Sequence, residues 1–500
     1  MEIFSGLGQG FSTAFSLYNL YYCLIGVTWG TIVGILPGLG PLGGTVLLLP
    51  ATFGMQPAAA VIMMAGIYYG AMYGGSTTSI LMNIPGEAAS VVTCLDGYQM
   101  ARKGRAGAAL FISAWGSFIG GTLSICGLAF LAPTLAQFAL QFGPAAMFAI
   151  TVLALLLISA LGKGSTLNTL CMAFLGLFLG TIGMDTMTGF LRMTYGIKEL
   201  SDGIGFIPVA MGIFGVSEIL VSTQTVLPTV IKPKLRELLP TREELNRSWG
   251  PIFRGSLLGF FIGLMPGSAH IVSSFASYAL EKKLSKTPEK FGTGMIEGVA
   301  GPETANNACT GSHMIPFLSL GIPTSPGIAL MMMALIIHGI TPGPLLVSKH
   351  PEIFWGVIAS MYIGNVILII LNLPMVGLFV NILRIPFRLL FPMILTICLI
   401  GIYSVNASRA ELAIMLIFGV IGVFLRRYGF DGAPLVMALI IGPMMELYLR
   451  QSLMISGGNP LFFLQSTLAT VLLSLAVLLI LGSFLLSYFK PQAKKVFEES

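Results

Sequence analysis

The sequence predicts an all-α polytopic integral membrane protein, with two inverted-topology repeats that contain broken helices or hairpins. Hydrophobic residues make up 55% of the chain and charged residues only 9%, whereas soluble domains carry about 25% charged residues. Apolar runs recur at lengths near the roughly 20 residues that cross a bilayer, which gives roughly 10–12 transmembrane or re-entrant segments. Similar Gly- and Pro-rich interruptions appear in both halves of the chain.

A polar, basic stretch between the apolar runs divides the chain. The apolar runs cover residues 17–36, 106–131, 143–161, 166–182 and 206–227 in the first half, and 259–265, 353–373, 389–403, 412–425, 433–447 and 461–486 in the second. Loops rich in Lys and Arg stay on the cytoplasmic side. We therefore predict a first membrane repeat (1–231), a basic cytoplasmic linker (232–250), and a second repeat (251–500) with additional C-terminal spans and a short polar tail.

The stretch 66–86 differs from an ordinary membrane span. It contains five glycines, four consecutive hydroxyl residues (76–79), Asn83 and Pro85. Irregular backbone at membrane depth is tolerated only where protein buries it or where it lines a wet cavity. The spacing of Gly66, Gly70 and Gly74 also suits close packing of two helices. We interpret the glycines as packing residues and the polar run that follows as part of a binding site.

Three short matches, in the same order, relate the two halves. Residues 34–38 match 263–267, Pro57 matches Pro288, and residues 83–86 match 321–324, with an insertion in the second half before this last match. Such ordered matches predict an internal repeat whose helices are interrupted at equivalent places. The residues expected to break helices are Pro37, Gly38, Pro85, Gly86, Pro266, Gly267 and Pro323.

Basic charge differs between corresponding loops of the two halves. The loop before Pro57 has no Lys or Arg, whereas the loop before Pro288 carries Lys282, Lys283 and Lys286. Because basic loops face the cytoplasm, this difference predicts that the repeats have opposite orientations in the membrane. The basic tail favours a cytoplasmic C-terminus, which requires an extra terminal span.

Paired, interrupted segments in the two halves of a membrane protein indicate a transport site. Neither segment contains Lys or Arg, so we expect an anionic substrate to be held by backbone N–H groups, neutral side chains and co-bound cations. The predicted substrate-binding residues are Ser76, Thr77, Thr78, Asn83, Asn306, Asn307, Thr324 and Ser325. The candidates for coupling a cation are Gly75, Ser79, Glu297, Glu303 and Thr304.

No metal or cofactor is expected besides the coupling cation. The six cysteines lie far apart without metal or redox spacing, and the four histidines share no helical spacing. Of the histidines, His270 follows a Pro-Gly break and is a candidate substrate contact. No nucleotide-binding or protease motif is present, so neither ATP hydrolysis nor proteolysis is expected, and the net charge of +6 does not indicate nucleic-acid binding.

These residues resemble the large membrane subunit (TctA type) of the tripartite tricarboxylate transporter family. The resemblance rests on residues 34–40, 73–87 and 96–98 in the first half, and on 302–307 and 321–323 in the second. It implies a multi-pass carrier in the bacterial inner (cytoplasmic) membrane that imports citrate-like tricarboxylates or related organic acids. It further implies a small membrane subunit, a periplasmic substrate-binding protein that delivers the ligand, and symport driven by a cation gradient, typically Na⁺.

Several points stay open at the level of sequence. Residues 308–313 are more polar than the family pattern, which leaves the identity of the acid open, and the sequence does not choose between Na⁺ and H⁺. A passive channel and a polytopic membrane enzyme are the alternatives. A channel usually forms rings by oligomeric symmetry and is recognised by single-channel recording, and an enzyme requires convergent acid–base or metal residues.

Overall fold

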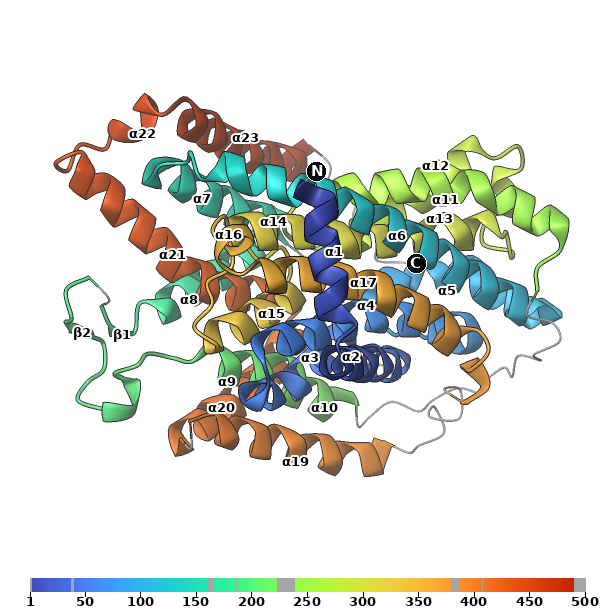
Figure 1. The fold of residues 1–500 in the computed structure, drawn as a ribbon, viewed down its shortest axis with the longest axis horizontal. Helices are drawn as coiled ribbons and strands as arrows, with labels where there is room; N and C mark the ends of the chain where they lie inside the picture. Colours follow the sequence, from blue (N-terminus) through green and yellow to red (C-terminus); the bar gives the residue numbers. More distant parts are fainter. Residues whose placement is uncertain are drawn as a thin grey trace. The chain divides into compact units, whose positions relative to one another are not determined.

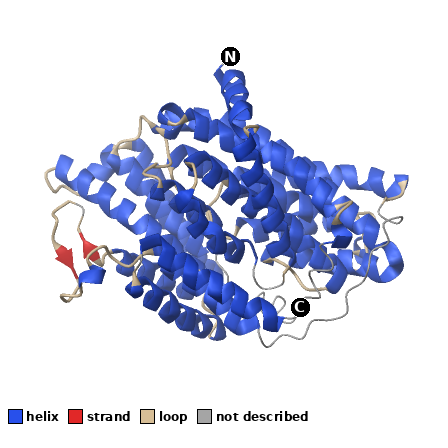
Figure 2. Ribbon diagram, turned by 60° about the horizontal axis from the view of Figure 1, so that its bottom comes forward, coloured by secondary structure: helices blue, strands red, loops and turns tan. Residues whose placement is uncertain are grey.

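Helices predominate in the part of the chain that the structure describes, and its strands form one short β-hairpin (Figure 2). The computed structural model describes residues 2–36, 40–160, 165–185, 187–222, 239–378, 387–406 and 408–489. The predicted break residues Pro37 and Gly38, and the first part of the predicted linker, lie outside these ranges. The all-α class predicted from the sequence is confirmed.

The chain divides into two compact units. The first contains α1 (Glu2–Ala14), α2 (Leu17–Ile35), α3 (Gly40–Leu48), α4 (Pro57–Met82), α5 (Val91–Met100), α6 (Ala106–Ala139), α9 (Phe206–Ala210), α10 (Ser217–Ser222), α11 (Arg242–Gly263), α12 (Ala269–Leu284), α13 (Glu297–Ser312), α14 (Met314–Leu320), α15 (Pro326–Ile337), α16 (Leu346–Lys349), α17 (Pro351–Asn372), α19 (Phe387–Asn406) and α20 (Arg409–Arg427). The second contains α7 (Pro144–Ala160), α8 (Thr166–Gly180), β1 (Gly183–Met184), β2 (Leu191–Arg192), α21 (Ala433–Ile455), α22 (Phe462–Gln465) and α23 (Thr467–Phe489) (Figure 1).

Four helical segments are long and apolar enough to cross a membrane among the residues that the structure describes. They are Pro57–Met82, Ala88–Ala139, Pro351–Asn372 and Ala433–Ile455. Shorter apolar helices are Pro144–Ala160, Thr166–Gly180, Phe206–Val216, Pro326–Ile337 and Thr467–Leu479. The first segment, α4, is 94% buried over its most apolar window. A helix enclosed in this way has neighbours on every side, which places α4 at the centre of the first unit.

Rows of glycine allow α4 and α13 each to pack closely against a partner helix. A Cβ on Gly26, Gly30 or Gly34 of α2 would lie within 2.5 Å of a backbone carbonyl oxygen of α4. In α11, a Cβ on Gly255 or Gly259 would meet carbonyl oxygens of α13 at 2.5 and 2.2 Å. Contacts this short exclude every residue except glycine. The helix pairs α2–α4 and α11–α13 are therefore packed in the same way, backbone against backbone.

The packed pairs define the internal repeat more accurately than the sequence does. Gly30 faces Ile67, and its repeat equivalent Gly259 faces Ala305. The offset in residue number between Ile67 and Ala305 also relates Asn83 to Gly321. These two residues end their helices, and both have left-handed backbone, with φ of 60° and 69°. The whole of α4 thus corresponds to α13 and α14 together. The additional residues of the second half lie in the loop before α13, and not within the helical segment as the sequence matches suggest.

Alanine at these glycines provides a test of the packing. We expect Gly30→Ala and Gly259→Ala each to lower the free energy of unfolding by about 1–3 kcal/mol, because the new methyl group overpacks a backbone contact. Gly8→Ala is the matched control, since a Cβ there meets nothing within 4 Å and alanine favours a helix by about 1 kcal/mol. Thermal unfolding of the purified proteins measures the stability of the two test variants and of the control. Equal unfolding temperatures for all three variants would contradict the close packing.

A charged network holds the hairpin against α21 in the second unit. Arg450 contacts Asp185 at 2.8 Å, and Arg192 of β2 contacts Glu446 at 2.7 Å. The backbone N–H of Met187 also donates to Asp185 at 2.8 Å. This backbone hydrogen bond, followed by the contact with Arg450, lowers the pKa of Asp185 to about 2. The carboxylate form of Asp185 is therefore the form that the folded hairpin prefers.

This lowered pKa predicts the pH range over which Asp185 stabilises the second unit. The ordinary pKa is 3.8, so the stabilisation is complete above about pH 4 and is lost as the pH falls towards about 2. We expect Asp185→Asn to lower the unfolding temperature at neutral pH, and this difference from the wild type to shrink below about pH 4. Asp202→Asn, at an exposed aspartate, is the control. A difference that does not change with pH would contradict the assignment.

Candidate functional site

The two predicted interruptions have the same construction in the structure. Asn83 ends α4, and an extended turn leads to Glu87, which caps the short 3₁₀ helix Ala88–Ser90. In the second half Gly321 ends α14, and an equivalent turn leads to Ser325, which caps α15. Asn and Gly are the residues that most readily adopt left-handed backbone. Each half thus presents a helix end, a Pro-containing turn and a capped helix start.

Each half contacts the turn of the other half through one hydrogen bond. The hydroxyl of Tyr68 in α4 lies 2.9 Å from the hydroxyl of Ser325. The side-chain amide of Asn306 in α13 donates to Glu87 at 2.9 Å. The offset in residue number that relates Asn83 to Gly321 also relates Tyr68 to Asn306 and Glu87 to Ser325. The two hydrogen bonds are therefore equivalent under the repeat, and the halves meet reciprocally around a pseudo-two-fold axis.

Helices α4 and α13 run antiparallel where they face each other. Tyr68 contacts His313, which directly follows α13, at 3.0 Å. Two turns further along α4, Ser76 donates a hydrogen bond to Glu303, which lies near the start of α13. Equivalent helices that run antiparallel are expected for repeats of inverted topology. The structure thus brings Ser76, Asn306 and Ser325, three of the predicted substrate residues, to the junction between the halves.

Glu303 is a buried carboxylate surrounded by hydroxyl groups. It is 1% exposed, and its two oxygens accept hydrogen bonds from Ser76 and from Thr93 of α5. Among the described residues, no lysine, arginine or histidine forms an ion pair with it. Moving a carboxylate out of water costs several kcal/mol after relaxation. A negative charge in this position is stabilised only by a bound proton or cation, and the coupling role of Glu303 stays a prediction.

Two neighbouring asparagines in α13 carry buried side-chain amide oxygens. Asn306 and Asn307 are 0% and 2% exposed, and the Oδ1 atom of each lacks a hydrogen-bond partner within the described part of the chain. Asn307 also borders a cavity of about 10 Å³, which is close to the space that one water molecule occupies. Its other polar lining residues are Tyr69, Tyr73, Thr310 and Asn365. The buried, unpaired acceptor of Asn307 beside this small cavity suits a bound water molecule or a small cation.

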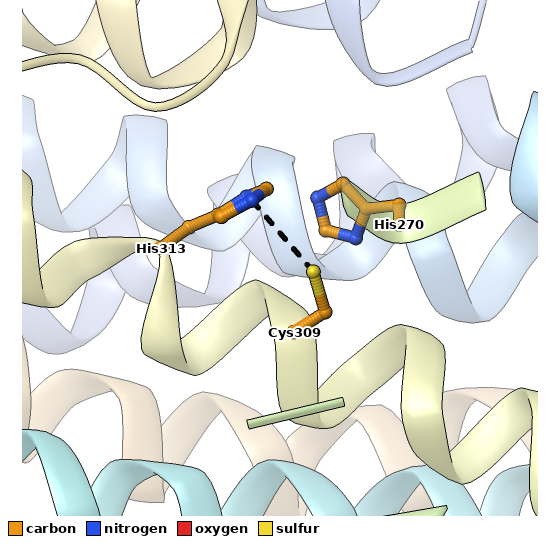
Figure 3. Close-up of side chains that lie close together, drawn as sticks. All are labelled: His270, Cys309 and His313. Carbon is orange, nitrogen blue, oxygen red and sulfur yellow. Dashed lines mark hydrogen bonds between the residues drawn. The ribbon is translucent and has the colours of Figure 1, made fainter. Parts of the chain in front are cut away.

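Two histidines and a cysteine converge beside the Tyr68–Ser325 contact. His270 comes from α12, Cys309 from α13, and His313 from the junction of α13 and α14, and their side chains point toward one another (Figure 3). All three are buried, and their donor atoms lie within 4.8 Å of one another. The hydroxyl of Tyr68 lies 2.7 Å from His270 and 3.0 Å from His313. This group joins α4, α12 and α13 in one polar cluster.

The other predicted site residues take varied positions. Thr78 and Ser79 bond back to the carbonyl of Gly75, Thr304 bonds to that of Ala300, and Thr324 bonds to that of His313. Thr77 is buried, whereas Asn83 is exposed. Glu297 forms an ion pair with Arg247 at 2.7 Å at the start of α13. The roles predicted for these residues stay predictions, and neither Asn83 nor Glu297 lies at the junction.

The predicted breaks that are described coincide with chain turns. Pro85 and Gly86 follow α4, Pro323 follows α14, and Pro266 and Gly267 lie between α11 and α12. Glycine is required at Gly86, where a Cβ would lie 2.2 Å from the carbonyl oxygen of Gly34. The first turn is thereby held against α2.

Sequence reasoning missed several residues that the structure brings to the junction. Tyr68 and Thr93 lack a motif, and Glu87 resembles a solvated loop residue in the sequence. The matched repeat offers a signal for two of them, because it aligns Tyr68 with Asn306 and Glu87 with Ser325. Cys309 and His313 are separated by one helical turn, a spacing that is visible only when cysteines and histidines are counted together.

Comparisons with known proteins identify relatives of this chain in Agrobacterium vitis. A protein of Agrobacterium vitis, described as an "Uncharacterized 52.8 kDa protein in TAR-I ttuC' 3'region", is 47% identical over 500 residues, which cover 100% of this chain and 99% of that protein. A second protein of Agrobacterium vitis, described as an "Uncharacterized protein in TAR-II ttuC' 3'region", is 45% identical over 241 residues, covering 48% of this chain and 99% of that protein. No solved structure matches the chain.

A family model also matches most of the chain. It is described as the "Tripartite tricarboxylate transporter TctA family" and covers residues 20–437. The match includes both interrupted segments, the Glu303 environment and the cluster around Tyr68.

Proposed function

The chain belongs to the tripartite tricarboxylate transporter TctA family, and from this premise we propose that it is the membrane subunit that imports a citrate-like tricarboxylate or a related organic acid together with a cation. Membership makes the chain a multi-pass membrane component of a transport system with other subunits. The finer assignment adds a small membrane subunit, a periplasmic binding protein that delivers the acid, and a location in the bacterial inner membrane. Neither ATP nor a bound cofactor takes part.

The reciprocal contact between the two halves is the observation that carries this proposal. The Tyr68–Ser325 and Asn306–Glu87 hydrogen bonds join equivalent parts of two inverted segments. A site that both halves share is the arrangement found in carriers that expose one site to each side of the membrane in turn. If the halves move relative to each other, these contacts are the ones that break and form again.

The chemistry of the junction suits an anionic substrate with a co-bound cation. Asn306 and Ser325 supply neutral polar groups, and the capped helix starts after Glu87 and Ser325 direct backbone N–H groups towards their caps. The unpaired side-chain oxygen of Asn307 and the carboxylate of Glu303 are oxygen ligands of the kind that hard cations prefer. We assign Asn306 and Ser325 to the carboxylate, and Asn307 and Glu303 to the coupling cation, which is Na⁺ or H⁺.

A passive channel and a membrane enzyme would each require a different structure at the junction between the halves. A passive channel requires a continuous aqueous path, and single-channel recording separates it from a carrier. A membrane enzyme requires convergent acid–base groups with access to a substrate, whereas the carboxylate of Glu303 is 1% exposed and surrounded by hydroxyls. This burial favours a carrier that opens by rearrangement over an enzyme.

Uptake by purified components tests this proposal. The chain is reconstituted in liposomes with its small membrane subunit, and uptake of labelled citrate is measured with and without the periplasmic binding protein. We expect uptake only when the binding protein is present. Uptake that is equally fast without the binding protein, or single-channel currents in a planar bilayer, would overturn the tripartite carrier in favour of an independent carrier or a channel.

A further inference from the structure

We propose that His270, Cys309 and His313 form a binding site for a borderline-soft transition metal, of which Zn²⁺ is the representative ion. The site is distinct from the oxygen-rich surroundings of Glu303 and Asn307, where a hard cation is expected. All three side chains are buried and their donor atoms lie within 4.8 Å of one another. Figure 3 shows the side chains converging from three different parts of the backbone.

The local backbone explains why these donors meet. Cys309 and His313 are separated by four positions along one helix, so they lie on the same face, and the Cys309 sulfur lies 3.7 Å from Nε2 of His313. The rings of His270 and His313 are 4.4 Å apart at an angle of 84°. Zinc–ligand bonds of about 2.0–2.3 Å place two ligand atoms of a tetrahedron on the order of 3.3–3.8 Å apart. Small rotations of the side chains complete that geometry.

Two supporting contacts are also in place. The Tyr68 hydroxyl lies 3.0 Å from Nδ1 of His313, the ring nitrogen that does not face Cys309. Nδ1 of His270 lies 3.4 Å from the backbone carbonyl of Asn306. Metal-binding histidines usually bond through their second ring nitrogen to such an oxygen, which fixes the ring. The cluster thus has three ligands and a hydrogen bond that orients each histidine.

The ligand types select the metal. One thiolate and two imidazoles suit Zn²⁺ and related ions, whereas Na⁺, Mg²⁺ and Ca²⁺ prefer oxygen. The thiol of Cys309 binds after it loses its proton, which is released to solvent. Because the Tyr68 hydroxyl of α4 contacts the metal-binding His313, the bound metal fixes the ring that joins the two halves. If the proposed transport function holds, Zn²⁺ therefore inhibits uptake.

Cobalt binding provides a test that does not depend on transport. The purified full-length chain in detergent is titrated with Co²⁺, and the visible and near-ultraviolet spectra are recorded. We expect one Co²⁺ per chain, with the strong d–d absorption of a tetrahedral ion and a thiolate-to-cobalt charge-transfer band. Zn²⁺ is expected to displace the cobalt and to remove both signals. A wild-type spectrum without a charge-transfer band overturns the proposal, whatever the behaviour of the variants.

Variants identify the ligands. Cys309→Ser is expected to abolish the charge-transfer band, and His313→Gln to weaken binding by at least about tenfold, since even the loss of a supporting contact weakens metal sites by that factor. Cys94→Ser and His338→Gln are the matched controls, at a cysteine and a histidine outside the cluster, and are expected to bind like the wild type. A charge-transfer band that persists in Cys309→Ser overturns the assignment. If the reconstituted wild-type chain does not take up the acid but still gives the cobalt spectrum, the transport proposal is rejected and the metal-site proposal is retained.

Discussion

Replacing Glu303 with glutamine is expected to lower coupled uptake by at least about 100-fold, which corresponds to about 3 kcal/mol. Glutamine has the same shape and retains partners in Ser76 and Thr93, whose hydroxyls donate to the carboxylate. It neither carries a proton nor provides the negative charge that a cation requires. We therefore expect the variant to fold, with an unfolding temperature equal to or above that of the wild type, and to fail in coupling.

The control for this prediction is Glu352→Gln. Glu352 is a half-exposed glutamate that lies beside His350 at 3.4 Å, so its replacement is expected to change uptake and stability little. Uptake is measured in liposomes with equal amounts of folded protein. If Glu303→Gln transports at the wild-type rate and still depends on a cation gradient, the carboxylate is not the coupling group.

The second large effect is expected at the Asn306–Glu87 contact. Asn306→Ala and Glu87→Gln are each predicted to lower uptake by at least about tenfold, because each changes the hydrogen bond at 2.9 Å that joins the halves. Residues that act as a pair show non-additive effects. The double variant is therefore expected to transport about as well as the poorer single variant.

Asn372→Ala is the matched control, since this buried asparagine donates to the carbonyl of Leu368 in its own helix. It is expected to retain most of the uptake activity. Effects of the two junction variants that multiply in the double variant would show that Asn306 and Glu87 act independently, and the reciprocal contact would then have no role in transport.

Much of the fold follows from simple features of the sequence. The low charge and the apolar runs predict an all-α membrane protein, and the family match supports the membrane assignment. The repeated Gly-Pro motifs predict equivalent breaks, which the structure has at Asn83–Gly86 and at its counterpart after Gly321. These features are predictable because glycine and proline act on the local backbone, where sequence and structure are directly linked.

The residue-by-residue alignment of the two halves could not be obtained from the Gly-Pro motifs. Matching Pro57 to Pro288 compares a helix start with a turn, and so it misplaces the insertion. The true register depends on which residues Gly30 and Gly259 touch, Ile67 and Ala305, and these contacts join separate helices. Short Gly-Pro matches carry no information about such contacts.

Some residues of the site can likewise be recognised from the sequence, and others only from contacts in the folded chain. Ser76, Asn306 and Glu303 stand out in the sequence because polar groups are costly in a membrane. Tyr68 does not stand out, since a tyrosine in an apolar run is ordinary. Its importance comes from His270, His313 and Ser325, which lie far away in the sequence and meet its hydroxyl only in the folded chain.

Concentrative uptake under defined ion gradients tests the central claim most directly. Liposomes that contain the complete transporter receive labelled citrate with an inward gradient of Na⁺, of H⁺, or of neither ion. We predict that the acid accumulates above its external concentration with one of the two gradients, and that it stops accumulating when an ionophore dissipates that gradient. Uptake that ends at equal concentrations on both sides under every gradient would contradict a cation-coupled carrier.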